Sequence, residues 1–360
     1  MPETALSPLA VYSARPTVRI NTQEYPLVSE LVVAMEMTEQ EGGMSALELR
    51  LSNIASDSNG GAAFAFEDDR ILKLGATIAL YGGDETAPQE IFQGKITGLE
   101  IDFPESGAPE LVVLAEDVFQ QARMARRTQV YNNVTIASLA QQFASRFNLT
   151  PVITGFSNNI GTQVQLNESD LAFLRRVFAH YDGDLQVVGR ELHISPRSEV
   201  RRNRIELELN GQLRRARILA DLSQQVTSVT VTGWNPNQGQ RVQANSRGSH
   251  LSLGFGKTGA QVLSQVLGDR PHHISHLAVS TTEEAEAIAN TAFDARARQF
   301  LVVEGTADGN PALRVGSHVV LRGLGDRFDN TYYVRRTCHR YGQRGYETDF
   351  EAECAYWGGN

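Results

Sequence analysis

Two stretches of this sequence, KLGATIALYGG at residues 73–83 and RVGSHVVLRGL at residues 314–324, follow one pattern. Each begins with a basic residue, an apolar residue and a glycine, continues through small or polar residues into an apolar strand, and ends near another glycine. Two further strand patterns follow each stretch: FQGKITGLEID and ELVVLAED after the first, TYYVRRTCH and YETDFEAEC after the second. Three similar elements in the same order indicate an internal duplication.

The duplicated regions have the pattern of β structure. Residues 1–120 contain short alternating segments such as LVVAMEM, ALELRLS and ATIALYG, separated by turns rich in Gly, Asp and Asn. This pattern predicts a barrel or a sandwich over residues 1–120, which we take as a first β-barrel domain. Residues 200–235 and 300–360 have the same character and predict a second, similar barrel. The fold class is therefore α+β, mainly β, with two similar β-barrel domains on either side of a small α/β insert.

The insert is predicted between residues 121 and 199, where the hydrophobic period changes. TIASLAQQFASRF at 135–147 and SDLAFLRRVFAHY at 169–181 each place apolar residues on one helical stripe. In NESDLAFLRRVFAHYDGDLQVVGRELHIS, residues 167–195, Asn167 or Ser169 is placed to cap the second helix. Gly183 is expected to end that helix at positive φ, and Gly189 to turn a hairpin. His180, in the last turn, suits the helix dipole when partly protonated. These acids and histidines therefore have structural roles.

The segment from 236 to 299 interrupts the second barrel. Residues 236–280 are rich in Gly, Ser and Asn, lack a firm period and are expected to form a long loop or extension. A helix should follow, opened by a capping box of Thr281 and Glu284, with Ala285, Ile288, Ala289, Ala292 and Phe293 on its inner face.

Composition and charge exclude several classes of protein. The chain has 360 residues, a net charge of −9 and no run of 18 apolar residues, so we expect neither a membrane span nor a secretory leader. The first 120 residues carry 6 basic and 20 acidic side chains, and the remainder is net positive. Since an acidic protein lacks the basic surface that phosphates need, no nucleic-acid recognition is expected. The basic run from Arg197 to Arg217 is interpreted as solvated strand faces or a contact with an acidic partner.

No pattern for catalysis or cofactor binding stands out, and we expect no enzyme activity, no cofactor and no metal. Cys338 and Cys354 are expected to be thiols in strands, too few for a disulfide framework. His272, His273 and His276 could offer imidazoles to a metal, but no cysteine or acid accompanies them, and a polar loop at an interface is the preferred interpretation.

The 167–195 stretch resembles the helix and hairpin of the central hub proteins of contractile phage tails, the late control protein D family, and of the N-terminal hub portion of VgrG spikes. The resemblance continues in SVTVTGWNPNQGQ from 228 and in VEGTADGNPALRVGSHVVLRGLGDRFDNTYYVRRTCHRY from 303. It departs at Thr331, where a Gly or Ser-Gly turn is commoner. The positions taken as structural signatures of the family are Leu171, Leu174, Tyr181, Gly183, Trp234, Gly305, Pro311, Gly316, Gly323, Phe328, Tyr333 and His339.

The resemblance implies a homotrimeric ring of pseudo-sixfold symmetry, synthesised in the bacterial cytoplasm and assembled in a tail or injection-system baseplate. Such a ring adapts the hexameric inner tube to the trimeric spike and also contacts other baseplate proteins. Because the sequence stops at Asn360, soon after the last strand, the spike is expected to be a separate polypeptide.

Two alternatives remain open at this stage. Residues 135–153, TIASLAQQFASRFNLTPVI, have the helix-and-strand order of a LysM-like module, which would make the chain a peptidoglycan-binding tail or cell-wall protein. A cell-wall hydrolase is the third hypothesis, and its only basis is the abundance of acidic residues.

Overall fold

The computed structural model describes residues 15–56, 61–83, 87–251 and 253–358, and the first repeat forms one half of a large sheet. This first half, residues 15–117, has a single core of strand side chains such as Val18, Met37 and Leu49. Its elements are β1 (Thr17–Ile20), β2 (Gln23–Glu24), α1 (Pro26–Glu30), β3 (Val32–Gln40), β4 (Ala46–Ser52), β5 (Ala55–Ser56), β6 (Ala62–Ala63), β7 (Thr77–Gly82), β8 (Gln89–Asp102) and β9 (Glu110–Asp117).

The second half, residues 204–222 and 300–357, repeats the arrangement. Its elements are β15 (Arg204–Glu208), β16 (Leu213–Ala220), β21 (Leu301–Asp308), β22 (His318–Arg322), β23 (Asn330–Gly342), β24 (Gly345–Cys354) and β25 (Tyr356–Trp357). The order β16-β21-β24-β23-β22-β15 corresponds to β3-β4-β9-β8-β7-β1. One difference is that β15 runs parallel to β22, whereas β1 runs antiparallel to β7.

The duplicated glycines have the same role in both halves. Gly75 (φ 81°) donates its N–H to Ile96 O over 2.8 Å, and Gly316 (φ 84°) donates to Val334 O over 2.9 Å. Both need the left-handed conformation that glycine adopts without strain.

Irregularities in the ladders also coincide. The register with the neighbouring strand slips after Ile96 in β8 and at the corresponding place in β23, after Val334. It slips again after Val32 in β3 and after Leu213 in β16, which are also corresponding positions. Because a β-bulge bends and twists its strand at a defined place, matched bulges give the two halves matched curvature. The duplication predicted from the sequence is therefore present down to individual residues.

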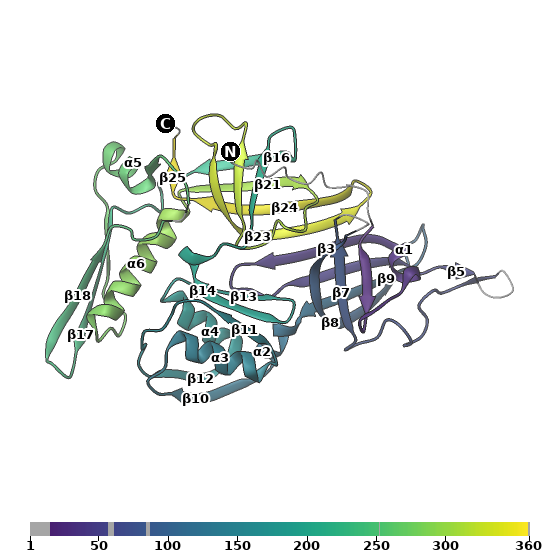
Figure 1. The fold of residues 1–360 in the computed structure, drawn as a ribbon, viewed down its shortest axis with the longest axis horizontal. Helices are drawn as coiled ribbons and strands as arrows, with labels where there is room; N and C mark the ends of the chain where they lie inside the picture. The colour runs from purple at the N-terminus through teal and green to yellow at the C-terminus, as the bar shows by residue number, and fades with distance from the viewer. Residues whose placement is uncertain (1–14, 57–60, 84–86, 252, 359–360) are drawn as a thin grey trace, which may run out of the picture.

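The fold class is confirmed as α+β, mainly β, and the two similar halves are joined in one sheet. The first part of β23 pairs with β22, and its second part pairs with β3, from Arg336 opposite Gln40 to Tyr341 opposite Met35. This β3–β23 ladder, the internal joint, merges both halves into one 13-stranded sheet (Figure 1). The length of β23, 13 residues, lets one strand serve both pairings.

The insert, residues 118–199, packs two helices between two small sheets (Figure 1). Its elements are a 3-10 turn (Val118–Gln120), α2 (Gln121–Met124), β10 (Arg126–Tyr131), α3 (Ile136–Arg146), β11 (Thr150–Ile153), β12 (Gln163–Ser169), α4 (Asp170–Ala179), β13 (Gly183–Val188), β14 (Glu191–Pro196) and a second 3-10 turn (Arg197–Glu199). Both predicted helices and the hairpin around Gly189 are confirmed. Ser169 caps α4 as predicted. The positive φ at the end of that helix belongs to Asp182 (49°) and not to Gly183.

Residues 236–280, expected to be a long loop or extension without a firm period, contain regular strands and a helix. Residues 226–298 form a side layer with its own core, in which α6 packs on a three-stranded sheet. Its elements are β17 (Ser228–Asn235), β18 (Gln240–Ser246), β19 (Lys257–Thr258), α5 (Gly259–Val266), β20 (Pro271–Ile274) and α6 (Thr282–Arg298). Strand β17, expected in the second barrel, pairs with β18 and β20 instead. Thr281 caps α6 as predicted, because its side chain accepts a hydrogen bond from Glu284 N. The Glu284 carboxylate accepts from Ser280 N and not from Thr281 N, so the second bond of the predicted capping box is missing. No helix among the described residues has the length and apolarity to cross a membrane.

Candidate functional site

An ion pair of Glu39 and Arg314 fixes the internal joint. Glu39, near the end of β3, is 2% exposed and accepts from Arg314 Nε at 2.7 Å, and a second bond joins its other oxygen to Arg314 Nη2. Thr337, opposite Glu39 in β23, donates to the same carboxylate at 3.3 Å. Burial alone would raise the pKa of Glu39, but the charge and hydrogen bonds of Arg314 outweigh it and lower that pKa. The two halves are thus held by a charged pair inside the sheet.

His339 lies next to this pair and is kept neutral. It is fully buried in β23, and its Nδ1 lies 2.7 Å from the Tyr346 hydroxyl. Burial and then the nearby Arg314 guanidinium lower its pKa to about 3. This signature position is therefore a buried sheet histidine whose Nδ1 is hydrogen-bonded, while its Nε2 has no hydrogen-bond partner among the described residues.

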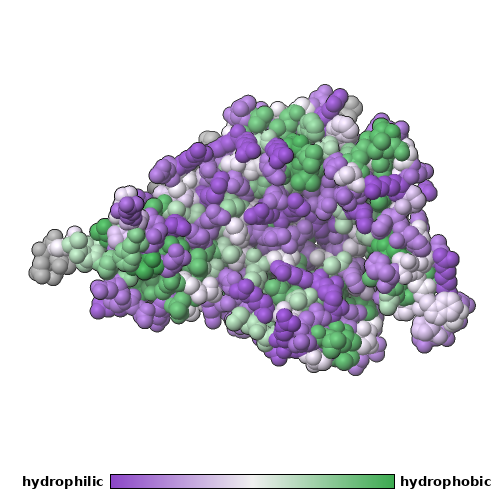
Figure 2. Space-filling view, turned by 180° about the vertical axis from the view of Figure 1, so that it is seen from behind, coloured by the Kyte–Doolittle hydropathy of each residue, from purple (hydrophilic) through white to green (hydrophobic). Residues whose placement is uncertain are grey.

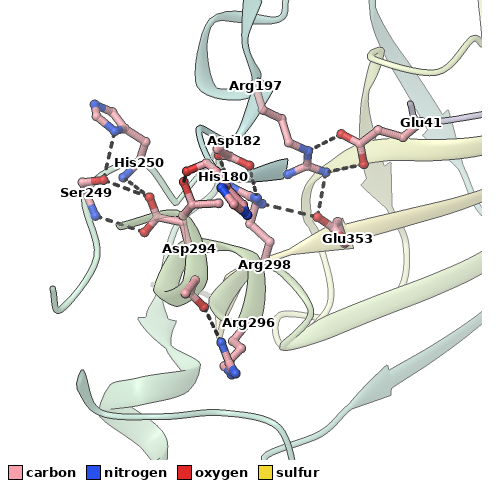
Figure 3. Close-up of polar contacts among 12 residues, drawn as sticks. Glu41, His180, Asp182, Arg197, Ser249, His250, Asp294, Arg296, Arg298 and Glu353 are labelled. Carbon is pink, nitrogen blue, oxygen red and sulfur yellow. Dashed lines mark hydrogen bonds and ion pairs between the residues drawn. The ribbon is translucent and has the colours of Figure 1, made fainter. Parts of the chain in front are cut away.

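Arg197 forms a second centre, where the insert meets both halves of the sheet (Figure 3). Its Nη2 lies 2.7 Å from Glu353 Oε1 of β24, and its Nε bonds to Glu41, which follows β3. Its guanidinium carbon lies 3.9 Å from the ring centroid of Tyr333. Burial opposes the positive charge, but Glu353 and Glu41 outweigh it and raise the pKa of Arg197 well above its ordinary value.

Arg298 adds the side layer to this centre. From the last turn of α6 it makes a two-bond contact with Asp182 of the insert, at 2.6 and 2.7 Å. Its Nε also lies 3.6 Å from Glu353 Oε1, so both arginines approach the same carboxylate (Figure 3). We call Glu41, Asp182, Arg197, Arg298 and Glu353 the charged junction, since it ties together side chains from all four packed units.

The charged junction and the internal joint orient the parts of the molecule that meet there. Each guanidinium is matched to carboxylates in two-bond or shared contacts, which define direction as well as distance. Burial, as the main cause, raises the thiol pKa of both Cys338 and Cys354 to about 12, which disfavours the nucleophilic thiolate. Both cysteines are free, as expected.

Acids and histidines of the 167–195 stretch form pairs within the insert, which fits the structural roles predicted for them. Glu168 pairs with Arg176 at 2.7 Å, and Asp170 pairs with Arg146 at 2.8 Å. His193 lies 2.9 Å from Glu191. Burial and then Arg176 lower the pKa of His180, which disfavours the protonated form expected in the last turn of the helix.

The family-signature positions are spread through the molecule and do not form one site. Most serve packing or turns. The insert core contains Leu171, Leu174 and Tyr181, and β13 begins at Gly183. The second half of the sheet contains or contacts Gly305, Phe328 and Tyr333. Pro311 packs near Gly83, and positive φ is found at Gly316 and Gly323. Trp234 differs, because it lies in β17 and is 59% exposed.

The histidines of residues 272–276 lie on the side layer, and His272 and His273 have side-chain partners. Arg296 Nη2 lies 3.3 Å from His272 Nε2, and Thr232 Oγ1 lies 2.9 Å from His273 Nε2. His276 is exposed. Across the described parts of the chain, no three His, Cys, Asp or Glu side chains are placed to hold a metal ion.

The apolar stripe of α3, the basis of the LysM-like alternative, is covered. Ile136, Leu139, Ala140 and Phe143 are all buried in the insert core. This helix face is therefore occupied by packing within the chain.

The charged junction was missed at the sequence level. Arg197 was interpreted as part of a solvated or partner-facing run, whereas it is 7% exposed and pairs with residues 156 positions away in both directions. The exposed arginines of β16, together with the exposed Arg201 and Arg204, fit the interpretation as a solvated or partner-facing run. No local pattern in the sequence predicts contacts between residues that lie so far apart in the chain.

The model of the Alg8 N-terminal domain family matches residues 47–343. No curated protein sequence matches the chain. Among solved structures, the chain is similar to the 43 kDa tail protein of prophage MuSo2 from Shewanella oneidensis, with 15% identity, a TM-score of 0.69 and coverage of 94% of this chain and 97% of that one. A tail protein from Neisseria meningitidis gives 11% identity, a TM-score of 0.66 and coverage of 95% and 96%.

The E. coli c3393 protein, described as a component of the type VI secretion system with structural similarity to the T4 tail proteins gp27 and gp5, is also similar in fold. It has 13% identity, a TM-score of 0.55 and coverage of 95% of this chain and 79% of its own. The resemblance to tail and secretion-system proteins identified from the sequence is thus confirmed as a similarity of fold.

Proposed function

This chain belongs to the Alg8 N-terminal domain family, and we propose that it is the structural hub of a contractile tail or injection-system baseplate. In this proposal three copies form a ring that presents six near-equivalent faces to a hexameric inner tube and a threefold face to a trimeric spike. The chain acts by adapting symmetry and catalyses no reaction. It is made in the bacterial cytoplasm and assembled into the baseplate beside other baseplate proteins.

The observation that carries the proposal is the duplication within the sheet. Two halves of one chain have corresponding strand order, corresponding glycines at positive φ and corresponding bulges. Three chains with two such halves give six similar units in a closed ring, while keeping threefold symmetry. A duplicated half is useful to a protein that meets a sixfold partner on one side and a threefold partner on the other.

The remaining units fit a scaffold. We propose that the insert and the side layer are two units attached to the ring, each with its own core and fixed to the sheet through the charged junction. Rigid attachment suits a protein that transmits position between partners.

The proposal is tested by measuring mass and assembly. Light scattering of the full chain should give three times 39.6 kDa, and the trimer should bind both the tube protein and the spike protein encoded beside it. A single protomer at all concentrations, with no binding to tube or spike, contradicts the proposal. A trimer that clears a cell-wall zymogram would contradict its non-enzymatic part.

A further inference from the structure

Strand β16 and the last part of β8 each have an edge without a partner among the described residues. Strand β16 pairs with β21 on one side only. Strand β8 pairs with β9 along most of its length, but on the other side β7 reaches only from Gln89 to Lys95, which leaves the edge of Gly98–Asp102 open. Open edges present unpaired N–H and C=O groups that another strand can bind.

The internal joint indicates which strands these two open edges can pair with. In the duplication β8 corresponds to β23 and β16 corresponds to β3, with the matched bulges fixing the alignment residue by residue. By that alignment, Arg336 corresponds to Gly98, and Gln40 corresponds to Asp221. The strands that pair with each other inside the chain, β3 and β23, are thus the counterparts of the two strands with open edges.

Transferring the register of the internal joint defines a specific pairing. Since Arg336 lies opposite Gln40, Gly98 would lie opposite Asp221 of another copy. The ladder then continues residue by residue in antiparallel register. The six expected pairs are Gly98–Asp221, Leu99–Ala220, Glu100–Leu219, Ile101–Ile218, Asp102–Arg217 and Phe103–Ala216.

Side-chain chemistry supports this register. On one face the pairs Leu99–Ala220, Ile101–Ile218 and Phe103–Ala216 are all apolar, and they correspond to the buried face of the internal joint. A shift by one residue would place these apolar side chains against the polar face.

The polar face adds one pair of opposite charges. In the internal joint Arg340 lies opposite Glu36, and in the transferred register Asp102 lies opposite Arg217, so opposite charges meet again with their places exchanged. Cross-strand pairs of opposite charge stabilise a sheet, and like charges destabilise it.

Three apolar residues of the two open edges are exposed. Ile101 is 46% exposed, Phe103 60% and Leu219 58%, whereas His339, the counterpart of Ile101 at the internal joint, is fully buried. Seen from behind, hydrophobic atoms gather over both halves of the sheet and are separated by a hydrophilic middle (Figure 2). Exposed apolar residues on an open strand edge indicate a surface that another chain covers.

We propose that strand β16 of one copy pairs antiparallel with residues 98–103 of the next copy, in the register of the internal joint. This head-to-tail contact uses two different surfaces, so it closes into a ring when the rotation per copy allows it. The inference rests on the proposed trimer and names the surface that forms it. In the closed ring, joints within a chain alternate with joints between chains.

The register is tested by cross-linking. The double variant Glu100→Cys/Leu219→Cys places thiols opposite each other on the polar face, and mild oxidation of the assembled full chain should give covalent dimers and trimers on a denaturing gel. The control Glu100→Cys/Asp221→Cys shifts one thiol by two residues on the same face and leaves the Asp102–Arg217 pair in place. At about 7–8 Å between Cα atoms that diagonal pair is too distant for an unstrained disulfide. Single variants and the wild-type chain control for Cys338 and Cys354.

The outcomes separate this inference from the proposed function. A trimer by light scattering with no in-register cross-link, or with equal cross-linking of the control, overturns the strand pairing and leaves the trimer. An in-register ladder that extends beyond the trimer supports the pairing and overturns the closed trimeric ring. A chain that stays a single protomer overturns both.

A charge variant tests the same contact without cysteines. Asp102→Arg puts like charges opposite each other and should weaken self-association at least tenfold. Glu105→Arg makes the same change of net charge beyond the proposed ladder, at an exposed residue, and should associate like the wild type. Equal association of both variants overturns the proposed register.

Discussion

Residues 39 and 220 occupy corresponding places in the two halves of the sheet but differ in chemistry. Glu39 is buried against Arg314 and Thr337 in a joint made within the chain. Ala220 lies at an edge that no described strand covers. The duplicated backbone is nearly the same in both places, so side chains decide whether an edge is closed at folding or left open for a partner. A buried ion pair suits the first case, because both charges leave water together as one chain folds.

Removing the cation of the internal joint should have the largest effect. Arg314→Met leaves the Glu39 carboxylate buried without its partner, and breaking such a pair costs about 3–5 kcal/mol of unfolding free energy. Lys73 is the counterpart of Arg314 in the first half and is exposed, so Lys73→Met should change stability by less than about 0.5 kcal/mol. Urea unfolding measures both. Similar losses for the two variants would mean that the joint does not depend on this pair.

Replacing the two glycines of the repeat by alanine should lower the unfolding free energy by different amounts, for a steric reason. A Cβ at Gly75 meets no atom within 4 Å, so Gly75→Ala should cost only the left-handed conformation, roughly 1–2 kcal/mol. A Cβ at Gly316 would lie 2.2 Å from Arg202 Nη1 and 2.9 Å from Val200 Cγ1. Overpacking adds about 1–3 kcal/mol, so Gly316→Ala should be the more damaging in thermal or urea unfolding. Equal losses would show that Arg202 moves away without cost.

The duplication and the helix starts of this protein could be predicted from the sequence, whereas the side layer could not. Gly75 and Gly316 revealed the duplication because a backbone position at positive φ favours glycine, which can be recognised in the sequence. Ser169 revealed the start of a helix because the N-cap position favours serine in the same way. The side layer was missed because β18, QRVQANS, offers only Val242 and Ala244 as buried apolar residues.

Long-range contacts leave no local pattern at all. Arg298 reaches Asp182 across 116 residues, and the joint of β3 with β23 spans almost the whole chain. Their partners are chosen by the packing of complete units, which no local window of sequence contains.

The buried histidine of the internal joint should make stability depend on pH. Its folded pKa is about 3, against about 6.5 in the unfolded chain, so below pH 6.5 the unfolded state binds more protons and stability falls. At pH 5 the loss from His339 alone should be about 2 kcal/mol relative to neutral pH. His339→Gln should remove that part of the slope in urea unfolding between pH 7.5 and 5.

A matched histidine on the surface controls for this slope. His276→Gln changes an exposed residue of the side layer and should keep the wild-type pH dependence. If both variants keep the full slope, His339 is not the group whose protonation opposes folding.

The smallest effect is expected at the open edge. Leu219→Thr places in β16 the residue type found at its counterpart, Thr38 of β3, and both residue types are tolerated in strands. Because Leu219 is 58% exposed, the unfolding free energy of the dissociated protomer should change by less than about 0.5 kcal/mol. Urea unfolding at a concentration where light scattering shows single protomers measures this. A loss above about 1 kcal/mol would mean that Leu219 is already covered within its own chain, and the contrast between a closed and an open edge would then fail.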